Sequence, residues 1–108
     1  MTGKFLGKIT SAEFGKCPDY PQFVGIQFKF RYDCFSEGCG GKYTVNLHEK
    51  CIWSKEERAI ACMNSFDEIN KILKAAKCNY VSQLVGKPVE ITVDGNSFKD
   101  FRILTEVL

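Results

Sequence analysis

Six cysteines and a single histidine are the residues of this sequence best suited to metal chemistry. Four of them follow the pattern Cys-x4-Cys-x8-His-x2-Cys, with glycines around the second cysteine that could form a tight loop. Three thiolates and one imidazole make a tetrahedral zinc set, so one hypothesis is a structural zinc site. Short zinc knuckles normally use Cys-x2-Cys, so the x4 spacing is a loose match. The favoured alternative is that these cysteines bind no metal and serve as small apolar residues in the core or in loops. The candidate metal ligands are Cys34, Cys39, His48 and Cys51.

No recognisable catalytic pattern accompanies these residues. A Cys–His nucleophile pair would need His48 beside a cysteine and a third group to orient it, and no local segment supplies both. The sequence contains no glycine-rich phosphate loop, no dinucleotide-binding glycine pattern and no His-Glu-x-x-His motif. The sequence therefore predicts a protein that is not an enzyme.

Two surfaces are candidates for binding a partner. The first is the polar face of the strand expected over 22–33, which can meet phosphate or an acidic protein, although such faces often serve only solubility. The second is the loop over 33–41, where an aromatic side chain could anchor a protein or a base, or fold back onto the core. The predicted contact residues are Gln27, Lys29 and Arg31 on the strand, and Tyr32, Phe35 and Tyr43 in and around the loop.

Hydrophobic periodicity predicts the elements that position these residues, in the order β-β-β-α-β-β. Strands are expected over 4–15, 22–33, 42–47, 89–93 and 98–107, with a flexible loop over 36–41. Alternating apolar residues mark the strand over 22–33 as half-buried and antiparallel. A turn with Gly95 at its centre joins the last two strands.

One long helix is expected between the third and fourth strands. Ser54 and Glu57 form a capping-box pattern that begins it, and it should run to about Lys77. Its apolar stripe should cover a sheet, which predicts an α+β fold with one antiparallel twisted sheet of about five strands packed against the helix. A partly closed barrel is the alternative. The stripe consists of Ala59, Cys62, Met63, Phe66, Ile69, Leu73 and Ala76.

Length and charge limit the domain count and the class of partner. The chain has 108 residues, 44% of them hydrophobic, which predicts a single domain over 1–108. Its net charge of +2 argues against a polyacidic nucleic-acid mimic and against a strongly basic coat protein. Lys4 and Lys8 interrupt the apolar residues near the N-terminus, which predicts no secretory signal, and no apolar run is long enough to span a membrane. We therefore expect a cytoplasmic protein with reduced thiols.

Five segments of the sequence carry a family resemblance, at 7–15, 24–28, 53–58, 84–96 and 100–108. Together they resemble a family of small proteins from tailed bacteriophages and prophages. The similarity covers most of the chain and is densest at the C-terminal end. The resemblance implies expression in the cytoplasm of an infected bacterium and carries over no catalytic residues. Family members have a loop with glycine and tryptophan where this chain has 33–42, and they generally lack these cysteines.

The resemblance and the lack of catalytic groups imply a protein that acts by binding. The first expectation is a non-enzymatic inhibitor of a bacterial host defence component, either anti-CRISPR-like or an antagonist of nucleotide-signalling immunity. Its partner would be a defence protein or a signal nucleotide. The alternatives are an accessory nucleic-acid-binding protein of phage replication or recombination, and a zinc-stabilised structural or interaction protein. The low net charge favours a protein or a small ligand as the partner over a nucleic-acid lattice. No membrane partner is expected. The sequence leaves open whether the protein forms a homo-oligomer.

Overall fold

The computed structural model describes residues 2–18, 20–32, 35–39, 41–47, 54–95 and 97–107. These residues form six strands and one long helix, joined in part by short 3-10 turns over 41–43, 81–84 and 105–107. The elements are β1 Gly3–Lys16, β2 Phe23–Tyr32, β3 Phe35–Cys39, β4 Thr44–Asn46, α1 Lys55–Ala75, β5 Pro88–Asp94 and β6 Ser97–Ile103.

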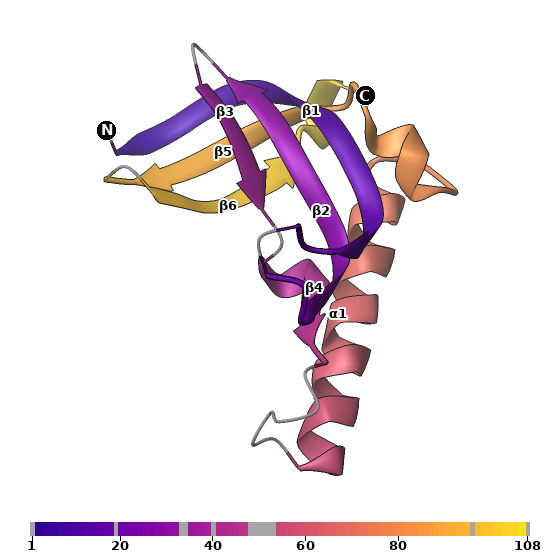
Figure 1. Cartoon of the computed structure of the whole chain (residues 1–108). Helices are drawn as coiled ribbons and strands as arrows, with labels where there is room; N and C mark the ends of the chain where they lie inside the picture. Colours follow the sequence, from indigo (N-terminus) through magenta and orange to yellow (C-terminus); the bar gives the residue numbers. More distant parts are fainter. Residues whose placement is uncertain are drawn as a thin grey trace.

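All six strands belong to one antiparallel sheet with β1 at its centre (Figure 1). The strand order is β3-β2-β1-β5-β6, and the short β4 pairs with β2 beside this path. Strand β5 returns after a long connection to lie next to β1, which is the order of a Greek key. The predicted α+β class, with one antiparallel sheet and one helix packed on it, is confirmed.

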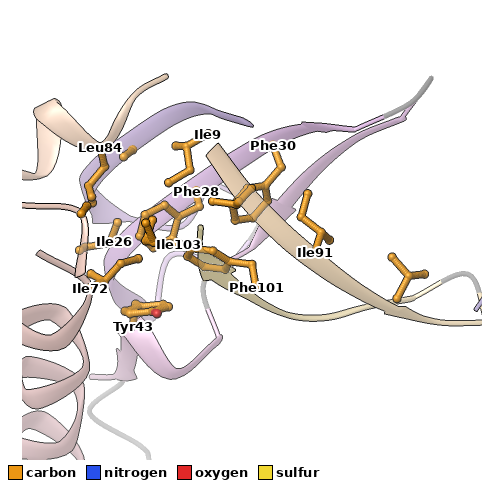
Figure 2. Packing of buried hydrophobic residues seen from close by; sticks show 14 residues of the cluster. Ile9, Ile26, Phe28, Phe30, Tyr43, Ile72, Leu84, Ile91, Phe101 and Ile103 are labelled. Carbon is orange, nitrogen blue, oxygen red and sulfur yellow. The ribbon is translucent and has the colours of Figure 1, made fainter. Parts of the chain in front are cut away.

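The sheet curls until its inner face meets itself. Phe28 and Phe30 of β2 contact Phe101 of β6, with ring centroids 5.1 and 4.6 Å apart. Strands β1 and β5 lie between β2 and β6 in the sheet, so these contacts require strong curvature. Figure 2 shows the three rings gathered among the buried aliphatic side chains. The core therefore fills the inside of a partly closed sheet, and it consists mainly of Ile9, Ile26, Phe28, Phe30, Tyr43, Ile72, Leu84, Val89, Ile91, Phe101 and Ile103.

An irregularity in β1 changes which of its residues face the core. Simple alternation predicts that Ile9 and Ala12 point to opposite faces, because an odd number of positions separates them. The pairing of β1 with β2 shifts between Ile9 and Ser11, as in a β-bulge, and both Ile9 and Ala12 are buried. The bulge also lets the 14-residue strand bend so that it pairs with β2 over one half and with β5 over the other.

Helix α1 begins where the capping pattern predicts. The Ser54 side chain accepts a hydrogen bond of 3.1 Å from the backbone N–H of Glu57. The helix ends at Ala75, where Lys77 adopts a φ of 57° and the Cys78 N–H donates to the Leu73 carbonyl. A left-handed residue just after the last turn is a common way to close a helix.

The predicted apolar stripe of the helix is only half correct. Of the predicted stripe, Ala76 is buried and Ile69 and Leu73 pack partly buried against the core, but Met63 and Phe66 are exposed. Ile72, which the stripe did not include, is buried. The N-terminal half extends past the sheet (Figure 1) and presents Ser65 to β4 and the turn before it. The Ser65 hydroxyl lies within hydrogen-bond distance of the Lys42 and Thr44 carbonyl oxygens, to which it can donate, at 3.1 and 3.3 Å. The inward face of the helix is therefore rotated away from the face that hydrophobicity alone selects.

Three other elements differ from the sequence prediction. The segment predicted as a loop over 36–41 contains most of β3, which pairs with the edge of β2. Pairing gives the backbone N–H and C=O groups of this segment hydrogen-bond partners that a loop would lack. The strand predicted over 42–47 begins with a 3-10 turn and keeps only β4. The last strand ends at Ile103, and a 3-10 turn takes its place over 105–107.

Candidate anion-binding face

Strands β1 and β2 bring three basic residues together on the outer surface of the sheet. Lys8 lies directly opposite Arg31, and Lys29 lies opposite Ser11. Residues 26, 28 and 30 point into the core, so the alternate positions Lys29 and Arg31 belong to the outer face. Lys8, Lys29 and Arg31 are all exposed, and they are called the basic face below.

The charges of the basic face have no carboxylate partner in the part of the chain that the structure describes. The neighbouring Lys4 differs, because its Nζ lies 3.9 Å from Glu90 Oε1. Like charges directly opposite each other on neighbouring strands destabilise a sheet. The pairing of Lys8 with Arg31 therefore costs free energy in the unbound protein, and a bound anion would remove that cost.

Small residues flank the basic face on the β3 side. Ser36 and Gly38 are the register partners of Arg31 and Lys29. On the β1 side, the nearest carboxylate along the register is Glu13, opposite Gln27, and the Ser11 hydroxyl lies 3.3 Å from Glu13 Oε1.

Gln27 continues the outer face of β2 beyond Lys29. Its side chain is half-buried, and its Nε2 atom is buried without a hydrogen-bond partner among the described residues. A buried amide that lacks a partner is costly, and this one lies beside the two cations.

The structure separates the predicted contact residues into two groups. Lys29 and Arg31 lie together with Gln27 on the outer face, as expected from the alternation. Tyr43, predicted as a contact residue, is only 5% exposed and packs edge-on against Phe28 with ring centroids 5.1 Å apart. This prediction needs correction, because the 3-10 turn before β4 directs the Tyr43 ring into the core.

The other two predicted contact residues are located by their backbones only. Tyr32 and Phe35 pair with each other at the β2–β3 end, and their side chains lie outside the described part of the structure. No pattern in the sequence identifies Lys8 as a member of the basic face. Only the register between β1 and β2 reveals it.

The zinc hypothesis falls largely outside the described residues. Cys39 is the last residue of β3, whereas Cys34, His48 and Cys51 are not described. Among the described residues, no group of three or more His, Cys, Asp or Glu side chains could hold a metal ion. The thiols of Cys17, Cys62 and Cys78 are free. A zinc site at the four predicted ligands therefore stays a prediction.

A second polar region lies between α1 and β4, in a pocket of about 420 Å³. Its charges pair with one another, since Lys42 Nζ lies 3.4 Å from Glu68 Oε2 and 3.8 Å from Asp100 Oδ1. Burial raises the pKa of Glu68, but Lys42 and Lys71 outweigh this effect and hold that pKa below its usual value. Because these charges pair with one another, they connect the helix to the sheet and are not available to a charged ligand. Its lining is Lys42, Thr44, Ala61, Asn64, Ser65, Asp67, Glu68 and Lys71.

Replacing Glu68 by Gln should remove a small, acid-sensitive part of the stability. The folded-state pKa of Glu68 is lowered from 4.5, so its contribution is fully present above about that pH and is lost as pH falls through the folded pKa. Ion pairs near the surface contribute up to about 1 kcal/mol. We expect urea unfolding to show a difference of this size between wild type and variant at pH 7, and a smaller one at pH 3. A difference that is as large at pH 3 as at pH 7 would contradict the ion-pair explanation, and Glu13→Gln is the control on the sheet.

Comparisons with protein-family models, with curated proteins and with solved structures found no match. Within the described residues, no helix combines the length and the apolar character needed to cross a membrane. The class of protein is therefore defined by its fold, a curled Greek-key sheet with one helix, and by the basic face that β1 and β2 carry.

Proposed function

We propose that this protein is a non-enzymatic binding protein that holds a phosphate-bearing ligand, and above all a single strand of nucleic acid, on the basic face. The observation that carries the proposal is the direct pairing of Lys8 with Arg31, with Lys29 next along β2 and no carboxylate paired with any of them among the described residues. Phosphate oxygens accept charge-assisted hydrogen bonds from lysine and arginine, and a guanidinium can bind two of them at once.

The connectivity of the sheet supports the same ligand class. A partly open, five-stranded Greek-key barrel is the framework of the oligonucleotide- and oligosaccharide-binding folds, which bind strands of nucleic acid across their second and third strands. The corresponding strands here are β2 and β3, and β2 carries Lys29 and Arg31. A similar fold alone assigns no function, so the proposal depends on the cations of the face.

A net charge of +2 and three cations indicate a short ligand with few phosphates. A signal nucleotide is the second source of such phosphates, and its sequestration would make the protein the defence antagonist that the phage resemblance implies. Inhibition of a defence protein by occlusion is a separate expectation from that resemblance. It predicts a stoichiometric host protein in pull-downs from lysate, and phage protection in defence-bearing cells.

The proposal predicts salt-dependent binding that is lost when the face is neutralised. Fluorescence anisotropy would compare labelled single-stranded DNA, single-stranded RNA, duplex DNA and a cyclic dinucleotide at 50 and 200 mM salt. Replacing Lys29 and Arg31 together by Ala should weaken binding of the preferred ligand about tenfold or more. The slope of log affinity against log salt should fall by about one to two.

A matched control separates the face from net charge. Lys55 and Lys99 are exposed, lie away from the basic face, and can be replaced together by Ala with the same loss of charge. We expect this variant to keep most of the affinity. An equal loss in both variants, or no binding of any of the four ligands at 50 mM salt, would overturn the proposal. Binding of the cyclic dinucleotide alone would identify the signal nucleotide as the ligand.

A further inference from the structure

The N-terminal half of α1 carries an uncovered row of large apolar side chains. Ile60, Met63 and Phe66 are 57%, 62% and 63% exposed. They follow one another at three-residue spacing, so they lie along one side of the helix. Ser65 and Ile72 on the opposite side are buried, which means that the row points away from the sheet. Ile60, Met63 and Phe66 are called the exposed row below.

We propose that a second copy of this chain covers the exposed row, through antiparallel pairing of the two α1 helices about a two-fold axis at Met63. In that arrangement, a residue before Met63 lies opposite the residue equally far after it on the other copy. Met63 then meets Met63, and Phe66 of each copy packs beside Ala59 and Ile60 of the other. The row is self-complementary, as a closed two-fold interface requires.

The charges around the exposed row fit the same antiparallel arrangement. Glu56 and Glu57 precede Met63 by seven and six positions, and Lys71 follows it by eight. Lys71 is level with Lys55 of the second copy, but helical spacing places Lys55 on the other flank of the exposed row. Lys71 and Glu57 share one flank, and Glu56 and Lys74 both lie beside the row, so the acidic first turn of one helix would meet Lys71 and Lys74 of the second copy. A parallel pair would instead set the acidic turns beside each other, with like charges in contact.

The existing partner of Lys71 does not prevent this contact. Lys71 Nζ lies 3.5 Å from Glu68 Oε1 within the chain, and the Lys71 side chain is 72% exposed. Exposed pairs of this kind contribute little to stability, so Lys71 can turn toward a second copy.

The shape of the molecule leaves room for the second helix. The N-terminal half of α1 projects past the sheet (Figure 1). Ser65 and Ile72, on the side of the helix opposite the exposed row, are the buried residues, so the sheet packs on that opposite side. Two copies would thus carry their sheets on the outer sides of the helix pair. A few side chains per copy bury less than the roughly 800 Å² per partner of a standard interface. The dimer should therefore form in the micromolar range.

Sedimentation equilibrium of the full chain between about 5 and 500 µM tests the dimer. We expect a monomer–dimer equilibrium for the wild type and a monomer throughout this range for Met63→Asp. The control is Val107→Asp, because Val107 is as exposed as Met63 but lies in the C-terminal 3-10 turn. A monomeric wild type at the highest concentration overturns the proposal, as does open-ended association, since a two-fold interface closes.

A charge-reversal pair tests the antiparallel direction. One variant carries Glu56→Lys and Glu57→Lys, the other Lys71→Glu and Lys74→Glu, and each alone should dimerise about tenfold more weakly than the wild type. Mixed together, they restore opposite charges at both ends of the helix pair, so the mixed dimer should form more tightly than either variant alone. A mixture that associates no better than its components would overturn the antiparallel model. Circular dichroism checks that both variants keep the helix.

Discussion

Replacing Gly25 by Ala should severely destabilise the protein, whereas the same change at its strand partner Gly15 should have little effect. A Cβ atom built on Gly25 would lie 2.0 Å from the Tyr43 carbonyl oxygen and 2.7 Å from the Thr44 Cα. Both are backbone atoms, so no side-chain rotation can relieve the clash. The chain can accept the methyl group only if β4 moves away from β2.

Moving β4 would also disturb the core, because Tyr43 directly precedes β4 and packs on Phe28. We expect a loss above about 3 kcal/mol, a large part of the total stability of a small domain. Urea unfolding followed by circular dichroism would measure it.

The control for this experiment comes from the sheet itself. Gly15 is the β1 partner of Gly25, and a Cβ atom there meets nothing within 4 Å. Gly15→Ala should change the free energy of unfolding by less than about 1 kcal/mol, because it fills open space and restricts the unfolded chain. If Gly25→Ala were as stable as Gly15→Ala, the close approach of the β2 and β4 backbones at Gly25 would be contradicted.

Replacing Phe101 by Ala should cost about 3–5 kcal/mol. Phe101 is 6% exposed, and its ring contacts those of Phe28, Phe30 and Tyr43 at centroid distances of 5.1, 4.6 and 5.8 Å. Phe101 belongs to β6, and two strands, β1 and β5, separate β6 from β2 in the sheet. Its removal therefore leaves a cavity where the curled sheet closes on itself.

A second aromatic residue provides the comparison for Phe101. Phe14 is 59% exposed, so Phe14→Ala should stay within about 1 kcal/mol of the wild type. Urea unfolding would measure the stability of both variants. If the slope of the unfolding free energy against urea concentration stays unchanged, the loss arises in the folded core. Equal losses at Phe14 and Phe101 would contradict the assignment of Phe101 to the centre of the core.

The parts of the fold that local chemistry controls could be predicted from the sequence. The alternation in β2 identified its buried face, because side chains of a strand alternate between the two sides. The Ser54 cap identified the start of α1, because it depends on residues three positions apart. The segment of β3 has no alternation of its own that predicts a strand, and its strand conformation depends on hydrogen bonds to β2.

The candidate site divides in the same way. Lys29 and Arg31 could be found from alternation within one strand, but Lys8 joins them only through the register of β1 against β2. Tyr43 flanks a glycine-rich segment, which predicts a binding surface, but the 3-10 turn buries it instead. Met63 and Phe66 are apolar, which predicts burial, but both are exposed on a helix that extends past the sheet (Figure 1).

The sequence by itself determined the α+β class, the order of most elements and the polar face of β2. These depend on the two periodicities of the backbone and on capping between near neighbours, which operate over a few residues. The tertiary structure decided the curvature of the sheet, the cluster of Lys8 with Arg31, the burial of Tyr43 and the exposure of Met63. Each of these depends on which distant surfaces meet, and that is fixed only when the whole core packs together.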